Sequence, residues 1–172
     1  MRISLSWVRV PAVLILISIL ILGCSGGKSP VVPNNPKDAQ SIVLSLGILS
    51  PAPAQGAEVT VPVLIADAHD LCAFSFRVQF DPEGLRPVAA DWGTFKGETD
   101  VVFNPLDKPG LLPLAYARLD GGGFKGDGTV CTLKFTVLDP SRTNLRIMKD
   151  PKYLVAYDPS HTPLNLTVGG EA

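Results

Sequence analysis

The segment DAHDLC, residues 67–72, gathers side chains of the types that most often hold a metal ion. Asp67, His69, Asp70 and Cys72 all fall within it. Structural zinc sites, however, take paired ligands at fixed spacings, and no spacing in this chain matches such a signature. We therefore interpret the segment as a polar loop between two strands and predict no metal there.

A second candidate is the glycine-rich segment LDGGGFKGDG, residues 119–128. It lacks the Gly-Lys-Ser/Thr ending of a phosphate-binding loop and opens no helix. Asp120 and Asp127 could share a calcium ion, but the alternating oxygen ligands of a calcium loop are missing. The segment is interpreted as a flexible hairpin connection.

The acidic residues give no sign of catalysis. A glycosidase needs two facing carboxylates, and the 16 scattered acidic residues permit pairs without indicating one. No nucleophile elbow is predicted, because such an elbow leads from a strand into a helix and no segment shows a convincing helical period. The sequence therefore predicts a protein that is not an enzyme, with no cofactor.

The first residues have the pattern of an export signal. Arg2 and Arg9 precede an uncharged apolar run over residues 10–22, which is shorter than the roughly 20 residues that span a bilayer. Gly23-Cys24 then resembles the bacterial lipobox. We expect residues 1–23 to be a lipoprotein signal peptide and Cys24 to carry the lipid; the alternative is an uncleaved membrane anchor.

Both alternatives place the remaining chain outside the cytoplasm. We expect it to be held at the cell envelope, at the outer membrane or the cell surface, with the domain facing the periplasm or the exterior. Residues 24–40 are rich in Pro, Gly and Ser, which is typical of a tether. Without residues 1–23 the chain has 15 − 2 = 13 basic and 16 acidic residues, a net charge of −3. This balance does not indicate nucleic-acid binding.

From residue 41 onward the sequence is a succession of short strands. The segment CAFSFRVQF, residues 72–80, alternates apolar and polar side chains, which predicts a strand with one buried face. Asp-Pro pairs at 81, 139, 150 and 158 punctuate the apolar runs, because Pro stops a strand and Asp accepts a hydrogen bond within the turn. Many short strands separated by such turns predict a β-sandwich or barrel.

Three motifs in order resemble the cohesin family, extracellular β-sandwich modules that bind dockerins. They are Gly56 to Val63 (G-x-x-V-x-V-P-V), Phe80 to Leu85 (F-D-P-x-x-L) and Asp127-Gly128 through Phe135. The resemblance covers residues 41–170. It implies an all-β fold, a nine-stranded jelly-roll sandwich in which Asp81-Pro82 forms a corner and Leu85 enters the core.

The resemblance also implies a docking face on one sheet. The strands that carry Cys72 and Cys131 are expected to be antiparallel neighbours in it, with both thiols buried and free. The outward residues expected to contact the partner are Arg77, Gln79, Tyr116, Arg118, Thr132 and Lys134. Well-known cohesins have polar residues where this chain has Leu71 and Ala73, so a partner other than a standard dockerin is also open.

The resemblance implies a non-catalytic binding module with a dockerin-bearing partner and a role in polysaccharide degradation, and the lipobox-like segment implies that the module is membrane-tethered. The alternative is a carbohydrate-binding module, because such modules share the sandwich architecture. They stack sugar rings on exposed aromatic side chains. Trp92 is the only Trp after the signal peptide and is the candidate sugar contact.

Overall fold

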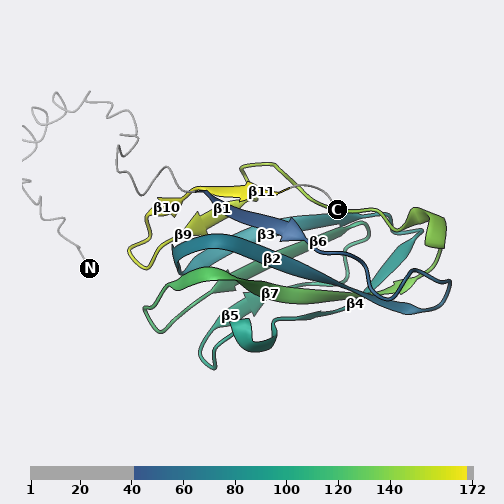
Figure 1. Ribbon diagram of the computed structural model, residues 1–172, viewed down its shortest axis with the longest axis horizontal. Helices are drawn as coiled ribbons and strands as arrows, with labels where there is room; N and C mark the ends of the chain where they lie inside the picture. Colours follow the sequence, from purple (N-terminus) through teal and green to yellow (C-terminus); the bar gives the residue numbers. More distant parts are fainter. Residues whose placement is uncertain (1–40, 170–172) are drawn as a thin grey trace, which may run out of the picture. The chain divides into compact units, whose positions relative to one another are not determined.

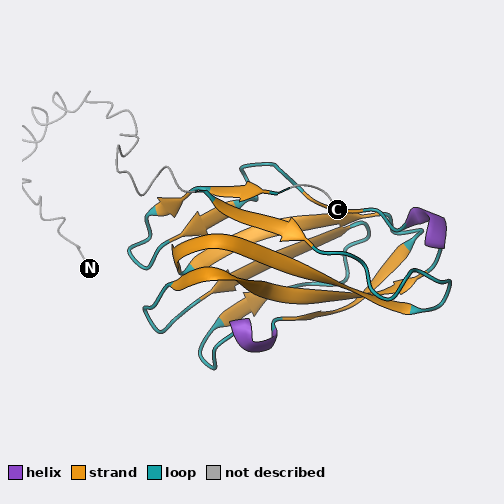
Figure 2. Cartoon of the chain, viewed as in Figure 1, coloured by secondary structure: helices purple, strands orange, loops and turns teal. Residues whose placement is uncertain are grey.

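The computed structural model describes residues 41–169. The predicted signal peptide and the whole tether, including Cys24, lie outside the described residues. The described part is built almost entirely from strands, with two one-turn 3₁₀ helices at Gly93–Phe95 and Pro140–Arg142 (Figure 2). Within this part, no helix has the length and apolar character needed to cross a membrane.

The strands form two packed antiparallel layers (Figure 1). The five-stranded sheet has the order β11 (Leu166–Val168), β1 (Ile42–Leu46), β2 (Glu58–Leu71), β7 (Phe124–Val137) and β4 (Leu85–Asp91). The six-stranded sheet has the order β10 (Pro163–Leu164), β9 (Val155–Tyr157), β3 (Ala73–Phe80), β6 (Leu111–Ala117) and β5 (Val101–Phe103), and β8 (Leu145–Ile147) also pairs with β3. One pair, β1 with β11, is parallel. The predicted all-β jelly-roll sandwich is confirmed.

The core lies between the sheets and follows from the alternation in the sequence. Every second residue of β3 is buried, namely Phe74, Phe76, Val78 and Phe80. The opposite sheet contributes alternating residues of β2 and β7, namely Val59, Val61, Val63, Leu133, Phe135 and Val137. Two half-apolar sheets can remove these faces from water only by packing against each other, which is why the chain forms a sandwich.

The Asp81-Pro82 corner carries the chain from one sheet to the other. The amide N–H groups of Gly84 and Leu85 donate to the carbonyl oxygen of Asp81, at 3.1 and 2.9 Å. Leu85, 1% exposed, then enters the core at the first position of β4. Both features were predicted.

All four Asp-Pro pairs also form a hydrogen bond between the aspartate side chain and the backbone of the turn. A carboxylate oxygen of Asp81, Asp139, Asp150 and Asp158 accepts the backbone N–H two residues later, at 2.8–2.9 Å. Each aspartate therefore satisfies a backbone donor within its own turn. Asp81 additionally accepts a hydrogen bond from Arg142, which is distant in the sequence, at 2.7 Å.

One implied pairing is wrong. The strand after Cys72 is β3, which pairs with β6, β8 and β9, whereas Cys131 lies on β7, which pairs with β2 and β4. The two strands therefore belong to opposite sheets. Both cysteines are free, as predicted, but Cys72 is only partly buried and its thiol lies 3.4 Å from the carbonyl oxygen of Arg118.

Candidate functional site

The register of the six-stranded sheet aligns outward side chains in two rows across four strands. The first row, from β5 to β9, is Val101, Ala117, Ala73 and Tyr157. The second row is Phe103, Ala115, Ser75 and Val155. These side chains point outward because the alternate residues of the same strands face the core: Phe74, Tyr116 and Ala156 belong to it, and Val102 packs against it.

The two rows create an exposed apolar patch, which we define as Ala73, Val101, Phe103, Ala115, Ala117 and Tyr157. Phe103 and Val101 are 58% and 54% exposed, and Tyr157 is 37% exposed. Small alanine side chains separate the larger residues on β5 from Tyr157 on β9. A contiguous apolar surface of this kind marks an interaction site more often than scattered single residues do.

The same face becomes polar farther along β3. The guanidinium carbon of Arg77 lies 3.3 Å from the ring centroid of Tyr153, a cation–π contact. Gln79 Oε1 accepts hydrogen bonds from Nε and Nη2 of Arg146, at 2.9 and 2.7 Å. Arg77 and Gln79 were predicted on the docking face, and they lie beside the apolar patch on the outer face of the six-stranded sheet.

Thr132 and Lys134 lie on a different face from the one expected. Both are on β7, where they pair with Pro62 and Thr60 of β2 in the five-stranded sheet. Lys134 Nζ forms an ion pair with Glu58 at 2.6 Å. Thr and paired charges are typical of the solvated face of an antiparallel sheet, so this part of the predicted site is separated from Arg77 and Gln79 by the core.

Tyr116 was predicted on the surface but is 2% exposed. Its ring packs against Phe95, Phe74 and Trp92, with centroid distances of 4.9, 5.4 and 5.9 Å. Its hydroxyl donates to Oδ2 of Asp100 at 2.5 Å. The inward side of β6 carries Leu112, Leu114 and Tyr116, so the small residues Ala115 and Ala117 face outward instead.

Asp100 is itself buried, at 7% exposure. Burial by itself raises the pKa of this carboxyl, but hydrogen bonds from Tyr116 and from the backbone of Gly97 and Leu119 outweigh burial and leave the pKa below its usual value. Burial, followed by the bond to Asp100, raises the pKa of Tyr116 far above its usual value. The pair is a structural tie between the segment before β5 and the C-terminal end of β6.

Arg118 lies just beyond β6. Its Nε is 3.0 and 3.1 Å from the two carboxylate oxygens of Asp120, and its backbone N–H donates to the carbonyl oxygen of Cys72. Burial alone lowers the pKa of Arg118, but the hydrogen bond and charge of Asp120 outweigh this and raise it. Arg118 therefore anchors the start of the glycine-rich connection at the end of the sheet.

Trp92 is also a core residue, at 5% exposure. Its ring stacks on Tyr116, at 5.9 Å between centroids and 22° between planes. A sugar ring can stack only on an aromatic face that reaches solvent. The predicted sugar contact at Trp92 is therefore wrong, and the structure gives it a packing role.

The polar segments with possible metal ligands have other roles. Within residues 41–169, no three His, Cys, Asp or Glu side chains lie close enough together to hold a metal ion. Asp127 accepts the backbone N–H of Asp67 at 2.8 Å, and Asp120 accepts that of Gly122 at 2.8 Å. The segment around His69 belongs to the irregular end of β2 rather than to the predicted loop.

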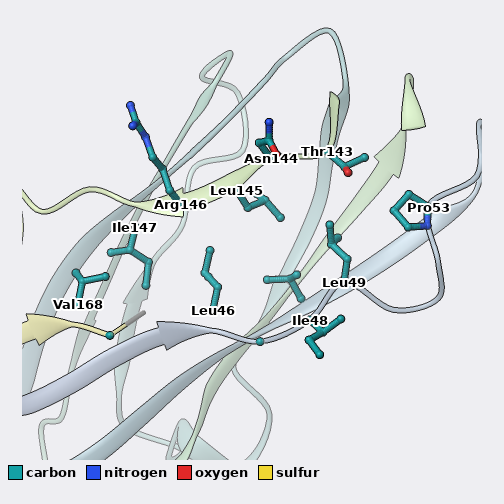
Figure 3. Close-up of a pocket in the computed structure, with 13 residues that line it drawn as sticks. Leu46, Ile48, Leu49, Pro53, Thr143, Asn144, Leu145, Arg146, Ile147 and Val168 are labelled. Atoms are coloured by element: carbon teal, nitrogen blue, oxygen red, sulfur yellow. The ribbon is translucent and has the colours of Figure 1, made fainter. Parts of the chain in front are cut away.

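A separate cleft of about 360 Å³ opens at the side of the sandwich, between β1 and β8 (Figure 3). The side chains of Leu46, Leu49, Leu145 and Ile147 gather in it, whereas that of Arg146 extends away from them (Figure 3). Its lining contains no acidic residue, histidine or cysteine. The cleft can accept an apolar group but holds no group for acid–base or nucleophilic chemistry.

Comparison with known proteins identifies the fold. A sequence model of the cohesin domain matches residues 45–170. No curated protein sequence is significantly similar to this chain.

Several solved structures share the architecture. The sixth cohesin of scaffoldin B from Acetivibrio cellulolyticus, solved with a Cel5 dockerin variant, is 18% identical, covers 76% of this chain and 95% of its own, and has a TM-score of 0.63. The cohesin of a type I cohesin–dockerin complex from Clostridium thermocellum is 14% identical, covers 75% of this chain and 94% of its own, and has a TM-score of 0.60. A non-cellulosomal cohesin from the archaeon Archaeoglobus fulgidus is 17% identical, covers 75% of this chain and 85% of its own, and has a TM-score of 0.54. At these identities the likeness shows a shared fold.

Proposed function

Because the chain belongs to the cohesin domain family, we propose that it is a non-catalytic docking module that binds a dockerin-bearing protein. The contact surface is the outer face of the six-stranded sheet. The observation that carries this proposal is the apolar patch, which exposes Phe103, Val101 and Tyr157 beside small residues. Two of the solved cohesins that share its fold were crystallised with a dockerin, which supports the choice of partner.

The physical argument rests on the contrast between the two outer faces. Specific interfaces bury about 800 Å² on each partner, and their energy is concentrated in a few large residues near the centre. Phe103 and Tyr157 are suitable anchors, since each exposes aromatic surface around a floor of alanine side chains. The face with Thr132 and Lys134 carries the ion pair of Lys134 with Glu58, and its exposed apolar side chains, Leu64 and Val88, are aliphatic and less exposed, at 37% and 40%, than Phe103 and Val101.

The test uses purified calcium-loaded dockerin modules titrated into the protein by calorimetry. Phe103→Asp places a charge in the patch and is expected to weaken binding by about 2 kcal/mol or more, the size of an interface hot spot. Thr132→Asp introduces the same charge on the opposite face and is the matched control. Binding lost equally in both variants, or in neither, would contradict the proposed surface.

We also propose that the domain is exported and tethered by a lipid at Cys24. The support is the sequence of residues 1–40, in which a short apolar run ends at a lipobox-like Cys and continues as a Pro-rich tether. Labelling the producing bacterium with a clickable fatty acid should tag the wild-type protein and leave Cys24→Ser untagged. Equal labelling of the two would refute the anchor.

A role in polysaccharide breakdown depends on the partner. The family's association with polysaccharide-degrading assemblies supports this role. The domain would take part in polysaccharide breakdown if the dockerin that it binds belongs to a polysaccharide-degrading enzyme. Direct carbohydrate binding has lost its candidate residue, because Trp92 is buried.

A further inference from the structure

The positive charges of the domain are unevenly placed. Residues 41–169 contain 11 basic and 14 acidic residues, a net charge of 11 − 14 = −3. Four of the 11 basic residues nevertheless lie on or next to the polar end of the six-stranded face. We call them the basic strip: Arg77, Arg146, Lys149 and Lys152.

The basic strip differs in its partners from four of the other seven cations of residues 41–169; the remaining three, Arg86, Lys96 and Lys108, form no ion pair with a described carboxylate either. Arg118, Lys125, Lys134 and Arg142 each form an ion pair with a nearby carboxylate. Among the described residues, no carboxylate lies within ion-pair distance of any member of the strip. Arg77 and Lys152 instead contact the ring of Tyr153, and Arg146 binds the neutral amide of Gln79.

The two arginines are held in place before any partner arrives. Ser75 Oγ donates to the carbonyl oxygen of Tyr153, which fixes the residue whose ring carries Arg77. Two hydrogen bonds from Arg146 to Gln79 fix the second guanidinium. A planar guanidinium held in this way loses little further entropy when it binds a carboxylate.

The nearest acidic residue does not neutralise the strip. Arg146, Lys149 and Asp150 line a hollow of about 220 Å³. Asp150 already accepts the backbone N–H of Lys152 at 2.9 Å and closes the Asp-Pro turn. With four positive charges and this one negative charge, the polar end keeps a net charge of +3.

The basic strip and the apolar patch form one continuous surface. Arg77 follows Ser75 by two residues on the same face of β3, a separation of about 7 Å. Gln79 and its bound Arg146 follow at the next outward position. A partner seated on the patch therefore places its flank over the strip.

Resting on the proposed docking function, we propose that the partner is acidic where it meets this domain: a dockerin module with Asp or Glu side chains beside its apolar contact residues. The strip selects such a partner because guanidinium and ammonium groups without a carboxylate of their own gain charge-assisted hydrogen bonds from it. A partner with Lys or Arg at the same positions would meet like charges, which cost affinity and suppress wrong pairings.

The test is a panel of purified calcium-loaded dockerin modules, half with acidic and half with basic surfaces outside their calcium loops. Each is titrated into the wild-type protein and into the double variant Arg146→Glu/Lys149→Glu. Arg86→Glu is the control, because Arg86 is an exposed cation of β4 in the opposite sheet. Phe103→Asp reports separately on the docking face.

Acidic modules are expected to bind the wild-type protein, and the double variant should bind them about tenfold or more weakly, while Arg86→Glu changes affinity little. The wild-type affinity should also fall between about 0.1 M and about 1 M salt, as the Debye length falls from about 10 Å to about 3 Å. Basic modules should gain affinity for the double variant.

Three results would overturn the inference. Binding that Phe103→Asp abolishes but charge reversal and salt leave unchanged would refute the acidic partner and preserve the docking function. No binding by any module would refute the docking function and the inference with it. A salt-insensitive dimer of this protein in sedimentation, dissolved by Phe103→Asp, would assign the face to a second copy of this chain.

Discussion

Replacing Tyr116 by Phe removes one oxygen atom and distinguishes a core role from a surface role for this residue. In the structure the hydroxyl is buried and donates to Asp100 at 2.5 Å. A hydrogen bond to a charged group contributes about 1.5–3 kcal/mol, and its loss leaves a buried carboxylate short of one donor. The ring contacts with Phe95 and Trp92 remain in the variant.

We therefore expect Tyr116→Phe to lower the free energy of unfolding by about 2 kcal/mol at pH 7. For a domain of this size that corresponds to about 8 °C in Tm, because each kcal/mol shifts Tm by about 4 °C. Binding to a dockerin should stay within a factor of about two, since the residue does not reach the surface. Tyr157→Phe, on the surface, is the stability control and should change stability by less than about 0.5 kcal/mol.

The effect should depend on pH with a definite sign. The pKa of Asp100 is lowered in the folded state, so its ionised form stabilises the fold above its unfolded pKa of about 3.9, and this stabilisation is lost as the pH falls through the lower folded value. The gap between wild type and Tyr116→Phe should be full at pH 7 and shrink below about pH 4. Thermal and urea unfolding at several pH values measure it. An unchanged Tm together with lost binding would refute the core assignment.

Two further predictions concern packing. In Gly84→Ala the new Cβ would lie 1.8 Å from the carbonyl oxygen of Arg142, so the Asp81-Pro82 corner must move. Urea unfolding should show that the free energy of unfolding falls by about 1–3 kcal/mol. Gly128→Ala is the control and should be near neutral, because the nearest atom to its new Cβ is 3.5 Å away. Cys131 is 1% exposed and burial raises the pKa of its thiol to about 12, so iodoacetamide should label it only after unfolding, and rapid labelling of the native protein would contradict its placement.

The strands and turns could be predicted from the sequence because their signals are local. The alternation in residues 72–80 fixes which face of β3 is buried, since a one-residue shift would place Phe74 and Phe76 in water. The Asp-Pro pairs predict the turns because each aspartate bonds to an amide only two residues away. Such signals need no knowledge of distant segments.

The proposed docking face was only half predictable because it depends on strand pairing. Arg77 and Gln79 follow from the alternation of one strand, but Thr132 and Lys134 were assigned to the same face by pairing β7 with β3, and β7 in fact pairs with β2 and β4. No local pattern distinguishes these pairings, because all of these strands have one apolar face.

Tyr116 was misplaced for a different reason. In the run LLPLAYA both faces of the strand are apolar, so alternation alone does not say which side is buried. The usable signal was size: Leu112, Leu114 and Tyr116 share one side and small residues share the other, and cores take the larger side chains. Val101 and Phe103 carry no such signal, because β5 is only three residues long and apolar throughout.

The most direct test of the central claim is methyl NMR of the protein with and without a bound dockerin module. The account predicts shifted methyl signals for Ala115 and Ala117 on the outer face of the six-stranded sheet, and unchanged signals for Ala66, an outward residue of β2 on the opposite sheet. Shifts at Ala66 with none at Ala115 and Ala117 would place the partner on the outer face of the five-stranded sheet and contradict the account.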